Sequence, residues 1–170
     1  MAAVIWPRQF TVRLVKRQWL APDIIEFCCT RPANLDFAQG QFLQFVTNGA
    51  KRDYTLVSAP DAPTLDFCLK VRPKGRFSKT ILEATPGHPF HISGPYGHFT
   101  CRRSSNPSVF AATGTGIAPF VAFSRDRVGN AMLLHGVDSS DALIYQPIVQ
   151  RAVERYIPCL GQTVENETHI

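Results

Sequence analysis

The sequence Arg-Asp-Tyr-Thr-Leu-Val-Ser, at residues 52–58, combines the composition of a β-strand with groups that suit an anionic, aromatic ligand. Alternate side chains of a strand share one face, so Arg52 and Tyr54 point the same way. The Arg52 guanidinium offers forked donors for a phosphate, the Tyr54 ring offers a stacking surface, and Thr55 adds a hydroxyl donor. An edge strand without a ligand has the same composition, so the neighbouring segments must decide between the two interpretations.

Strand-like runs lie on both sides of this segment. Gln9–Lys16 alternates apolar and polar residues, the period of two expected of a half-buried strand. Three further runs are rich in β-branched and aromatic residues and are bounded by turn formers: Ile24–Thr30, Gln41–Thr47 and Leu65–Arg72. We predict a sixth strand at His88–Ser93 and one short helix at Ser78–Ala84. Strands at this spacing, without long helices between them, predict an antiparallel barrel or sandwich.

The pattern changes after the polar segment Cys101–Pro107, which we interpret as a linker. Strands then alternate with helices, which predicts a parallel sheet. The predicted strands are Ser108–Ala112, Ala131–Val137 and Ile157–Leu160, and the predicted helices are Ile117–Arg127 and Gln146–Tyr156. We therefore expect a β-barrel domain at residues 1–103 and a small α/β domain at residues 104–170, whose sheet has an unpaired edge.

Composition excludes several classes of protein. No apolar run approaches the ~20 residues that cross a bilayer, and the N-terminus lacks the apolar core of a signal peptide, so we expect a soluble cytoplasmic protein. The five cysteines lack metal-ligand spacing, which predicts no metal site. Basic residues between Lys51 and Lys79 suit a phosphate, an acidic partner or a solvated face, and no nucleic-acid-binding motif accompanies them.

Three glycine-containing motifs follow the Arg-x-Tyr-Thr strand. Residues 75–78, Gly-Arg-Phe-Ser, open the predicted helix, where N–H groups suit a phosphate and Ser78 suits the N-cap. Residues 94–97, Gly-Pro-Tyr-Gly, predict a tight turn. Residues 113–119, Thr-Gly-Thr-Gly-Ile-Ala-Pro, join a predicted strand to a predicted helix, the context in which a glycine-rich turn cradles a pyrophosphate.

In this order the motifs resemble those of the ferredoxin-NADP reductase family of flavoproteins. That family carries Arg-x-Tyr-Ser/Thr, Gly-x-x-Ser, Gly-Pro-aromatic-Gly and Gly-x-Gly-x-x-Pro, and the resemblance runs from about Gln9 to Leu160. It implies an antiparallel six-stranded Greek-key β-barrel that binds flavin. A Rossmann-like parallel α/β nucleotide domain follows the barrel, and here we expect it to be short and incomplete.

The resemblance also implies roles for individual residues. Arg52 would contact the flavin diphosphate, Tyr54 would pack on the isoalloxazine ring, and Thr55 would hydrogen-bond near the reactive nitrogen, so Tyr54 and Thr55 are the candidate catalytic residues. His135 and Gly136 end a predicted strand where the family reads the adenosine ribose. The candidate cofactor-binding residues are Arg52, Tyr54, Thr55, Lys70, Val71, Arg72, Gly75, Phe77, Ser78, Tyr96, Thr113, Gly114, Gly116, Ile117, Pro119, His135 and Gly136.

The function implied is a flavin-dependent oxidoreductase that binds FAD rather than FMN. It would use NAD(P)H as donor and pass electrons to a protein or metal-centre acceptor such as an acidic ferredoxin. Residues 138–141 contain no Arg to hold a ribose 2′-phosphate, and we assign Arg151 and Arg155 to a solvated helix face, so the expectation leans to NADH. The alternative is an electron-carrier module or truncated reductase, because the family's later Cys-Gly motif does not appear before Ile170 and Cys159 precedes Leu160 instead.

Overall fold

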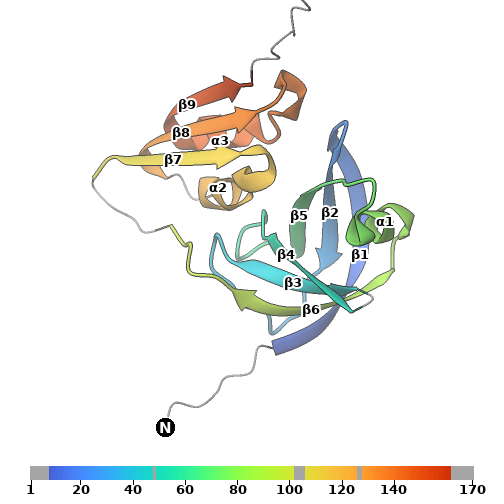
Figure 1. Ribbon diagram of the computed structural model, residues 1–170. Helices are drawn as coiled ribbons and strands as arrows, with labels where there is room; N and C mark the ends of the chain where they lie inside the picture. Colours follow the sequence, from blue (N-terminus) through green and yellow to red (C-terminus); the bar gives the residue numbers. More distant parts are fainter. Residues whose placement is uncertain (1–7, 48, 102–105, 126–127, 162–170) are drawn as a thin grey trace, which may run out of the picture.

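The computed structural model describes residues 8–47, 49–101, 106–125 and 128–161 (Figure 1). Within these residues the chain forms two sheets, one six-stranded and one three-stranded. Figure 1 shows the six strands with helix α1 at one end of the molecule and the three strands with α2 and α3 at the other. The predicted boundary between residues 103 and 104 lies outside the described residues.

The six-stranded sheet forms an antiparallel barrel. Its strands are β1 (Arg8–Ala21), β2 (Ile24–Thr30), β3 (Phe42–Thr47), β4 (Ala50–Thr55), β5 (Thr64–Lys70) and β6 (Pro89–Tyr96). Their order, β4-β3-β6-β1-β2-β5, places the last strand between the third and the first, as in a Greek key. An isolated antiparallel bridge between Leu56 and Phe67 links the end of β4 to β5 and closes the barrel.

Aromatic residues fill the barrel core. Phe27, Phe45 and Phe67 are fully buried, and their ring centroids lie 5.1–5.7 Å apart. Helix α1 (Arg76–Glu83) covers the core with Phe77 and Ile81. Inward residues alternate with outward ones along β3 and along the first half of β1, where the period-two pattern of the sequence predicts it, whereas residues 67–69 of β5 are buried in succession.

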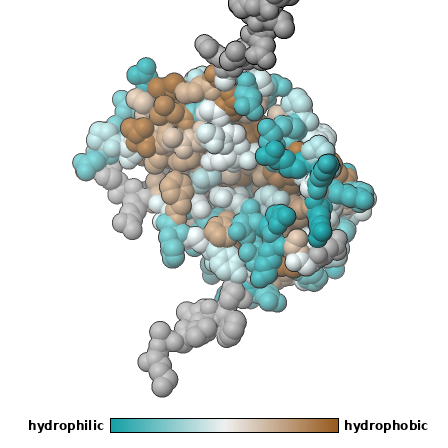
Figure 2. Space-filling model, in the orientation of Figure 1, coloured by the Kyte–Doolittle hydropathy of each residue, from teal (hydrophilic) through white to brown (hydrophobic). Residues whose placement is uncertain are grey.

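The second module is a parallel sheet with helices on one face. It comprises β7 (Ser108–Thr113), the 3₁₀ turn η1 (Gly114–Ile117), α2 (Ala118–Ser124), β8 (Gly129–Val137), η2 (Ser140–Ala142), α3 (Gln146–Ala152) and β9 (Val153–Leu160). The strand order is β7-β8-β9, and both pairings are parallel. Figure 1 shows α2 below β7 and α3 against β8 and β9, and Figure 2 shows a hydrophobic patch over this module. Val109 of β7 is 70% exposed.

The two modules share a buried cluster of side chains. Ile24, Val57 and Cys68 of the barrel pack in it with residues of η1 and α2, among them Ile117 and Phe120. This packing brings the turn after β7 against the end of β5, so the two modules form one continuous body.

Several predicted boundaries differ from the structure. Helix α3 ends at Ala152, because residues from Val153 onward pair in parallel with β8, so Arg155 lies on β9 and not on the predicted helix. Strand pairing supplies these backbone groups with partners that local propensity does not reveal. The predicted turn at residues 94–97 is partly wrong as well, since β6 continues through Gly94 to Tyr96 and contains a cis Gly94–Pro95 bond. The predicted helix Ile117–Arg127 is observed as η1 followed by α2, and its residues 126–127 lie outside the described part.

Gly40 is a position at which the fold excludes a side chain. Its φ is +86°, and an added Cβ would lie 2.0 Å from the Phe99 carbonyl oxygen. Gly49 has a similar φ of +75° but no atom within 4 Å of an added Cβ. Both glycines therefore have a positive φ, but only at Gly40 would an added Cβ overlap a neighbouring atom.

We expect Gly40→Ala to lower the free energy of unfolding by about 3 kcal/mol or more, from backbone strain of about 1–2 kcal/mol plus overlap with Phe99. The matched variant Gly49→Ala loses only the strain, about 1–2 kcal/mol. Urea denaturation of both variants measures the difference. Equal losses would contradict the close approach of Phe99 to Gly40.

Candidate functional site

The Arg-x-Tyr-Thr motif lies at the end of β4, beside helix α1. The Tyr54 ring is half-buried, with its centroid 4.9 Å from that of Phe77 and 5.7 Å from that of Phe45. Burial raises the pKa of the Tyr54 hydroxyl to about 12, so the side chain is neutral at physiological pH. Arg52 is exposed, and its Nη1 donates to the Lys51 carbonyl over 2.7 Å. The strand thus presents an aromatic ring and a solvent-accessible cation beside the first turn of α1.

A hollow of about 320 Å³ joins this motif to the glycine-rich turn. We call it the β4–β5 hollow. Residues from both modules line it: Asp53, Tyr54 and Thr55 of β4, Cys68, Leu69 and Lys70 of β5, Thr115 and Gly116 of η1, and Ala118. The structure therefore brings together two motifs that lie about sixty residues apart in the sequence.

The Gly-Arg-Phe-Ser motif forms the start of α1, although Ser78 does not cap it. Gly75 is the N-cap residue, no side chain caps the helix, and Ser78 lies within the first turn. The predicted N-cap role of Ser78 is therefore wrong. Its buried hydroxyl accepts a hydrogen bond from the Arg72 N–H over 3.0 Å, because the Gly75 N–H donates to the Arg72 carbonyl and folds that residue back over the helix.

The start of α1 is strongly basic. Arg72, Lys74 and Arg76 are exposed there, and the first turn contains no acidic residue. Helix N-terminal N–H groups and the helix dipole favour a negative charge at this position. Phe77 itself is buried in the barrel core, so only its backbone faces the surroundings of the turn.

A second hollow, the inter-module cleft, has a volume of about 540 Å³ and lies where the parallel strands end. Lys70 and Arg72 line it on the barrel side, and Thr113, Gly114, Gly136, Asp138 and Cys159 line it on the other. Ligands of open α/β sheets bind at the carboxyl ends of the strands, which form this wall. Lys70 Nζ spans the cleft, 3.1 Å from Asp23 and 3.8 Å from Asp138.

His135 lies beneath this cleft and has no exposed surface. Its Nδ1 is 2.9 Å from the Tyr156 hydroxyl and its Nε2 is 3.1 Å from the Gly114 carbonyl oxygen. Burial lowers the pKa of the imidazole, which favours the neutral ring. Of the two predicted residues at this strand end, only Gly136 lines the cleft, so the His135 side chain is not placed to touch a ligand directly.

The remaining predicted site residues are in part buried in the protein core and in part distant from the Arg-x-Tyr-Thr motif. Tyr96 stacks on Phe42 at 5.5 Å, and because Phe42 pairs with both Thr55 and Tyr96, the ring lies two strands from the end of the Arg-x-Tyr-Thr motif. Val71 is half-buried and packs against the barrel core. Ile117 is buried and Pro119 is half-buried in the first turn of α2.

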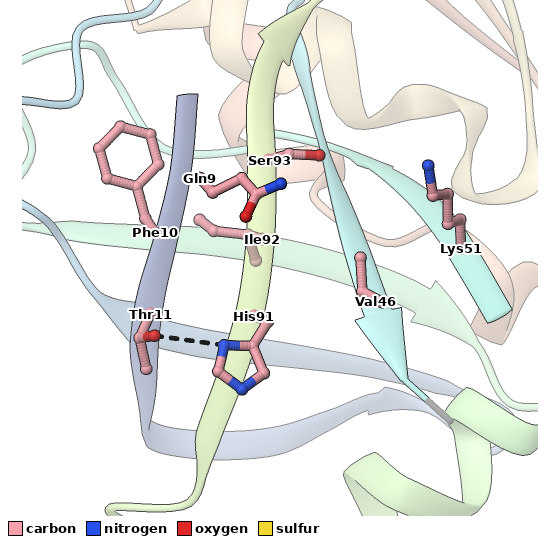
Figure 3. A pocket seen from close by; sticks show the side chains of 8 residues that line it. All are labelled: Gln9, Phe10, Thr11, Val46, Lys51, His91, Ile92 and Ser93. Atoms are coloured by element: carbon pink, nitrogen blue, oxygen red, sulfur yellow. Dashed lines mark hydrogen bonds between the residues drawn. The ribbon is translucent and has the colours of Figure 1, made fainter. Parts of the chain in front are cut away.

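A third hollow, of about 460 Å³, lies on the outer face of the barrel (Figure 3). It contains the Thr11–His91 hydrogen bond of 3.2 Å, with Lys51 at its far side. Lys51 and Arg52 are consecutive strand residues and point to opposite faces of the sheet. None of the predicted site residues lines this hollow.

Sequence reasoning missed a polar link between the modules. Tyr145 precedes α3 with a positive φ of 58°, and its hydroxyl donates to Glu26 Oε2 of β2 over 2.6 Å. The other oxygen of Glu26 accepts from Gln18 Nε2 over 2.8 Å. A carboxylate inside the apolar run Ile24–Thr30 was a signal that this strand has a polar partner, but 119 positions separate Glu26 from Tyr145.

Within the described residues no group of three or more His, Cys, Asp or Glu side chains is arranged to hold a metal ion. In the same part of the chain, no helix has the length and apolar composition needed to cross a membrane.

Residues 11–101, more than half of the chain, match the family model for the oxidoreductase FAD-binding domain. The chain belongs to this family. The curated proteins to which it is similar include ferredoxin–NADP reductase B of Sorangium cellulosum, at 31% identity over 156 residues, covering 84% of this chain and 64% of that protein. The electron transfer component of Burkholderia cepacia 2-halobenzoate 1,2-dioxygenase is 30% identical over 122 residues, 66% of this chain and 36% of that protein.

Solved structures have the same fold. A ferredoxin NADP+ reductase from Neisseria gonorrhoeae with bound FAD and NADP superposes with a TM-score of 0.76 at 25% identity, over 88% of this chain and 67% of that one. The Amycolatopsis cytochrome P450 reductase superposes with a TM-score of 0.78 at 24% identity, over 91% of this chain and 52% of that one. The fold predicted from sequence, an antiparallel barrel followed by a parallel α/β module, is confirmed. The chain spans between about a third and two thirds of the length of the curated relatives named above.

We expect Tyr145→Phe to lower the free energy of unfolding by about 1–3 kcal/mol, because the partly buried Glu26 carboxylate loses a donor. Tyr96→Phe is the matched control, since the Tyr96 hydroxyl donates to the neutral Ser93 Oγ over 3.0 Å and its loss costs about 0.5–1.5 kcal/mol. Chemical denaturation measures both values. A Tyr145 variant as stable as the unmodified chain would show that this bond does not hold the modules together.

Proposed function

We propose that the chain is the FAD-binding part, with part of the nucleotide-binding module, of an oxidoreductase. In this proposal NAD(P)H is the donor and an electron-transfer protein or metal centre is the acceptor. The observation that carries the proposal is the β4–β5 hollow, where Tyr54 and Thr55 of the barrel meet Thr115 and Gly116 of the glycine-rich turn. A flavin and a nicotinamide must be held close together for hydride transfer, and this hollow is common to both motifs.

The residues present fit FAD. The exposed cations Arg72 and Arg76 lie at the acid-free first turn of α1, and the exposed Arg52 lies two residues before Tyr54, whose ring packs on Phe77 of that turn. These cations suit a diphosphate. Tyr54 and Thr55 would hold the ring, one by its aromatic face and one by its hydroxyl. Bound FAD supplies the hydride and single-electron chemistry, and the side chains supply binding, orientation and charge. Tyr54 is half-buried and neutral, and burial raises the pKa of its hydroxyl further above the physiological range, so the ring contributes an uncharged stacking surface.

The inter-module cleft is the proposed nucleotide site, and its chemistry favours NADH. Asp138 directly follows β8, its side chain is 97% exposed, and residues 138–141 contain no Arg. A carboxylate at a strand end of this kind suits ribose hydroxyls and repels a 2′-phosphate. Gly136, Thr113 and Gly114 would let the nucleotide approach the backbone. The boundary between the barrel domain and the partial nucleotide domain, at residues 103 and 104, forms part of the same proposal.

The acceptor that we propose is an acidic protein such as a ferredoxin, in the cytoplasm. The exposed side chains Lys74 and Lys79, which are not assigned to the diphosphate, support it, because opposite charge steers an acidic partner to this surface. The second candidate function is an electron-carrier module without efficient NAD(P)H oxidation. The observation that favours it is the three-stranded sheet of the second module, whose described strands are covered by helices on one face only. Parallel sheets that form complete nucleotide-binding domains are normally covered on both faces.

We expect Arg52→Ala to weaken FAD binding about ten- to a hundredfold, since it removes charge-assisted bonds to the diphosphate. Lys51→Ala is the matched control, because it removes one positive charge from the same strand on the opposite face. Titration of the apoprotein with FAD, followed by flavin fluorescence, measures both affinities. Equal affinities for FAD would remove Arg52 from the proposed site.

We expect the FAD-reconstituted chain to show a visible flavin band that bleaches when NADH is added without oxygen, and more slowly with NADPH. Stopped-flow absorbance measures the two rates. A band that persists with both nucleotides would support the carrier function. A chain that retains no flavin would contradict the FAD assignment itself.

A further inference from the structure

We propose that His135 is a positioning residue of the nucleotide site, which sets the orientation of the peptide bond between Gly114 and Thr115. This inference rests on the proposed function, because it assigns the glycine-rich turn to nucleotide binding. His135 acts through the Gly114 carbonyl, since the His135 side chain has no exposed surface with which to touch a ligand.

The hydrogen bonds of His135 define its protonation state. The Gly114 carbonyl oxygen, 3.1 Å from Nε2, can only accept, so Nε2 must carry the proton. Nδ1 is then the acceptor, and the Tyr156 hydroxyl donates to it over 2.9 Å. A neutral imidazole satisfies both bonds, which agrees with the lowered pKa that burial gives the ring. The Gly114 carbonyl therefore selects the tautomer, and the Tyr156 hydroxyl, which can donate or accept, donates to Nδ1.

The hydrogen bond from His135 joins the central strand of the sheet to the turn that follows its neighbour β7. His135 lies in the central strand β8, paired with Ala112 of β7 on one side and Pro158 of β9 on the other. Its ring reaches from β8 to the first residue of η1, directly after β7 ends. Gly114 has a φ of +48°, and no atom lies within 4 Å of the position that a Cβ would take. The His135 bond adds a side-chain restraint to a residue that has no side chain of its own and that the 3₁₀ turn η1 restrains through its backbone.

Because the peptide between Gly114 and Thr115 is planar and trans, holding the Gly114 carbonyl also sets the direction of the Thr115 N–H. The C=O and N–H of one trans peptide point in opposite directions, and the cis bond found in the described residues is Gly94–Pro95. With the Gly114 oxygen held toward the buried His135, the Thr115 N–H must point away from the interior. Gly114 and Thr115 line the inter-module cleft, so this N–H faces the side on which a nucleotide would lie.

Two substitutions separate the halves of the His135 interaction. In His135→Asn the amide oxygen lies near the position of Nδ1 and keeps an acceptor for Tyr156, but no donor reaches Gly114. In His135→Gln an amide N–H lies near the position of Nε2 and restores that donor. NAD+ and NADP+ are the probes, since the oxidised nucleotides bind without reducing the flavin. Calorimetry gives their affinities for the FAD-loaded variants, and FAD affinity and thermal melting report folding.

We expect His135→Asn to weaken nucleotide binding about five- to tenfold with FAD affinity unchanged, and His135→Gln to recover most of the loss. Nitrogen-15 spectra of the unmodified chain should show a protonated Nε2 and an unprotonated Nδ1 on His135. Unchanged nucleotide affinity in the Asn variant, equal losses in both variants, or the opposite tautomer would overturn the role of His135 alone. An unmodified chain that holds FAD but binds neither nucleotide would contradict the proposed function, and the role of His135 with it.

Discussion

Closure of the barrel between β4 and β5 is the constraint on which the candidate site depends. The strands meet through the Leu56–Phe67 bridge and the hydrogen bond from the Val57 N–H to the Asp66 carbonyl, 2.8 Å long. Leu56 directly follows Thr55, so closure fixes the end of the Arg-x-Tyr-Thr motif against β5. The stacked Phe27 and Phe67 rings, 5.2 Å apart, fill the interior behind this seam. Burial of apolar surface thus stabilises the arrangement, and polar groups remain at the rim.

The seam also provides the platform for the second module. Cys68 is the residue after Phe67, and its buried thiol faces the Thr115 carbonyl across a contact of 4.0 Å. Burial raises the pKa of this thiol to about 12, so it packs there as a small uncharged group. Tyr145 and Glu26 add a directional bond to the same interface. Apolar packing brings the modules together, and the polar link defines where α3 lies relative to β2.

The β4–β5 hollow and the inter-module cleft are lined by different chemical groups. The β4–β5 hollow has an aromatic and a hydroxyl group from the barrel, and the inter-module cleft has glycines and a carboxylate from the parallel strands. Lys70 belongs to both and pairs with acidic residues of each module. One bound molecule in each hollow would therefore share Lys70 and the turn at Thr115, which is the arrangement that an exchange of electrons between two cofactors requires.

The barrel strands, the order of the motifs and the change to an α/β pattern could be predicted from the sequence, because period-two alternation and glycine positions are local properties. The sequence did not predict that Val153 and Arg155 belong to strand β9 and not to the preceding helix, since only pairing with β8 makes the extended backbone favourable there. It also did not show that Ser78 bonds to Arg72, or that His135 is buried against Tyr156 and Gly114. Those roles depend on contacts between segments distant in sequence, or on the exact path of a turn. A local residue pattern does not predict which distant residue a side chain contacts, because the packing of the complete fold selects the partners.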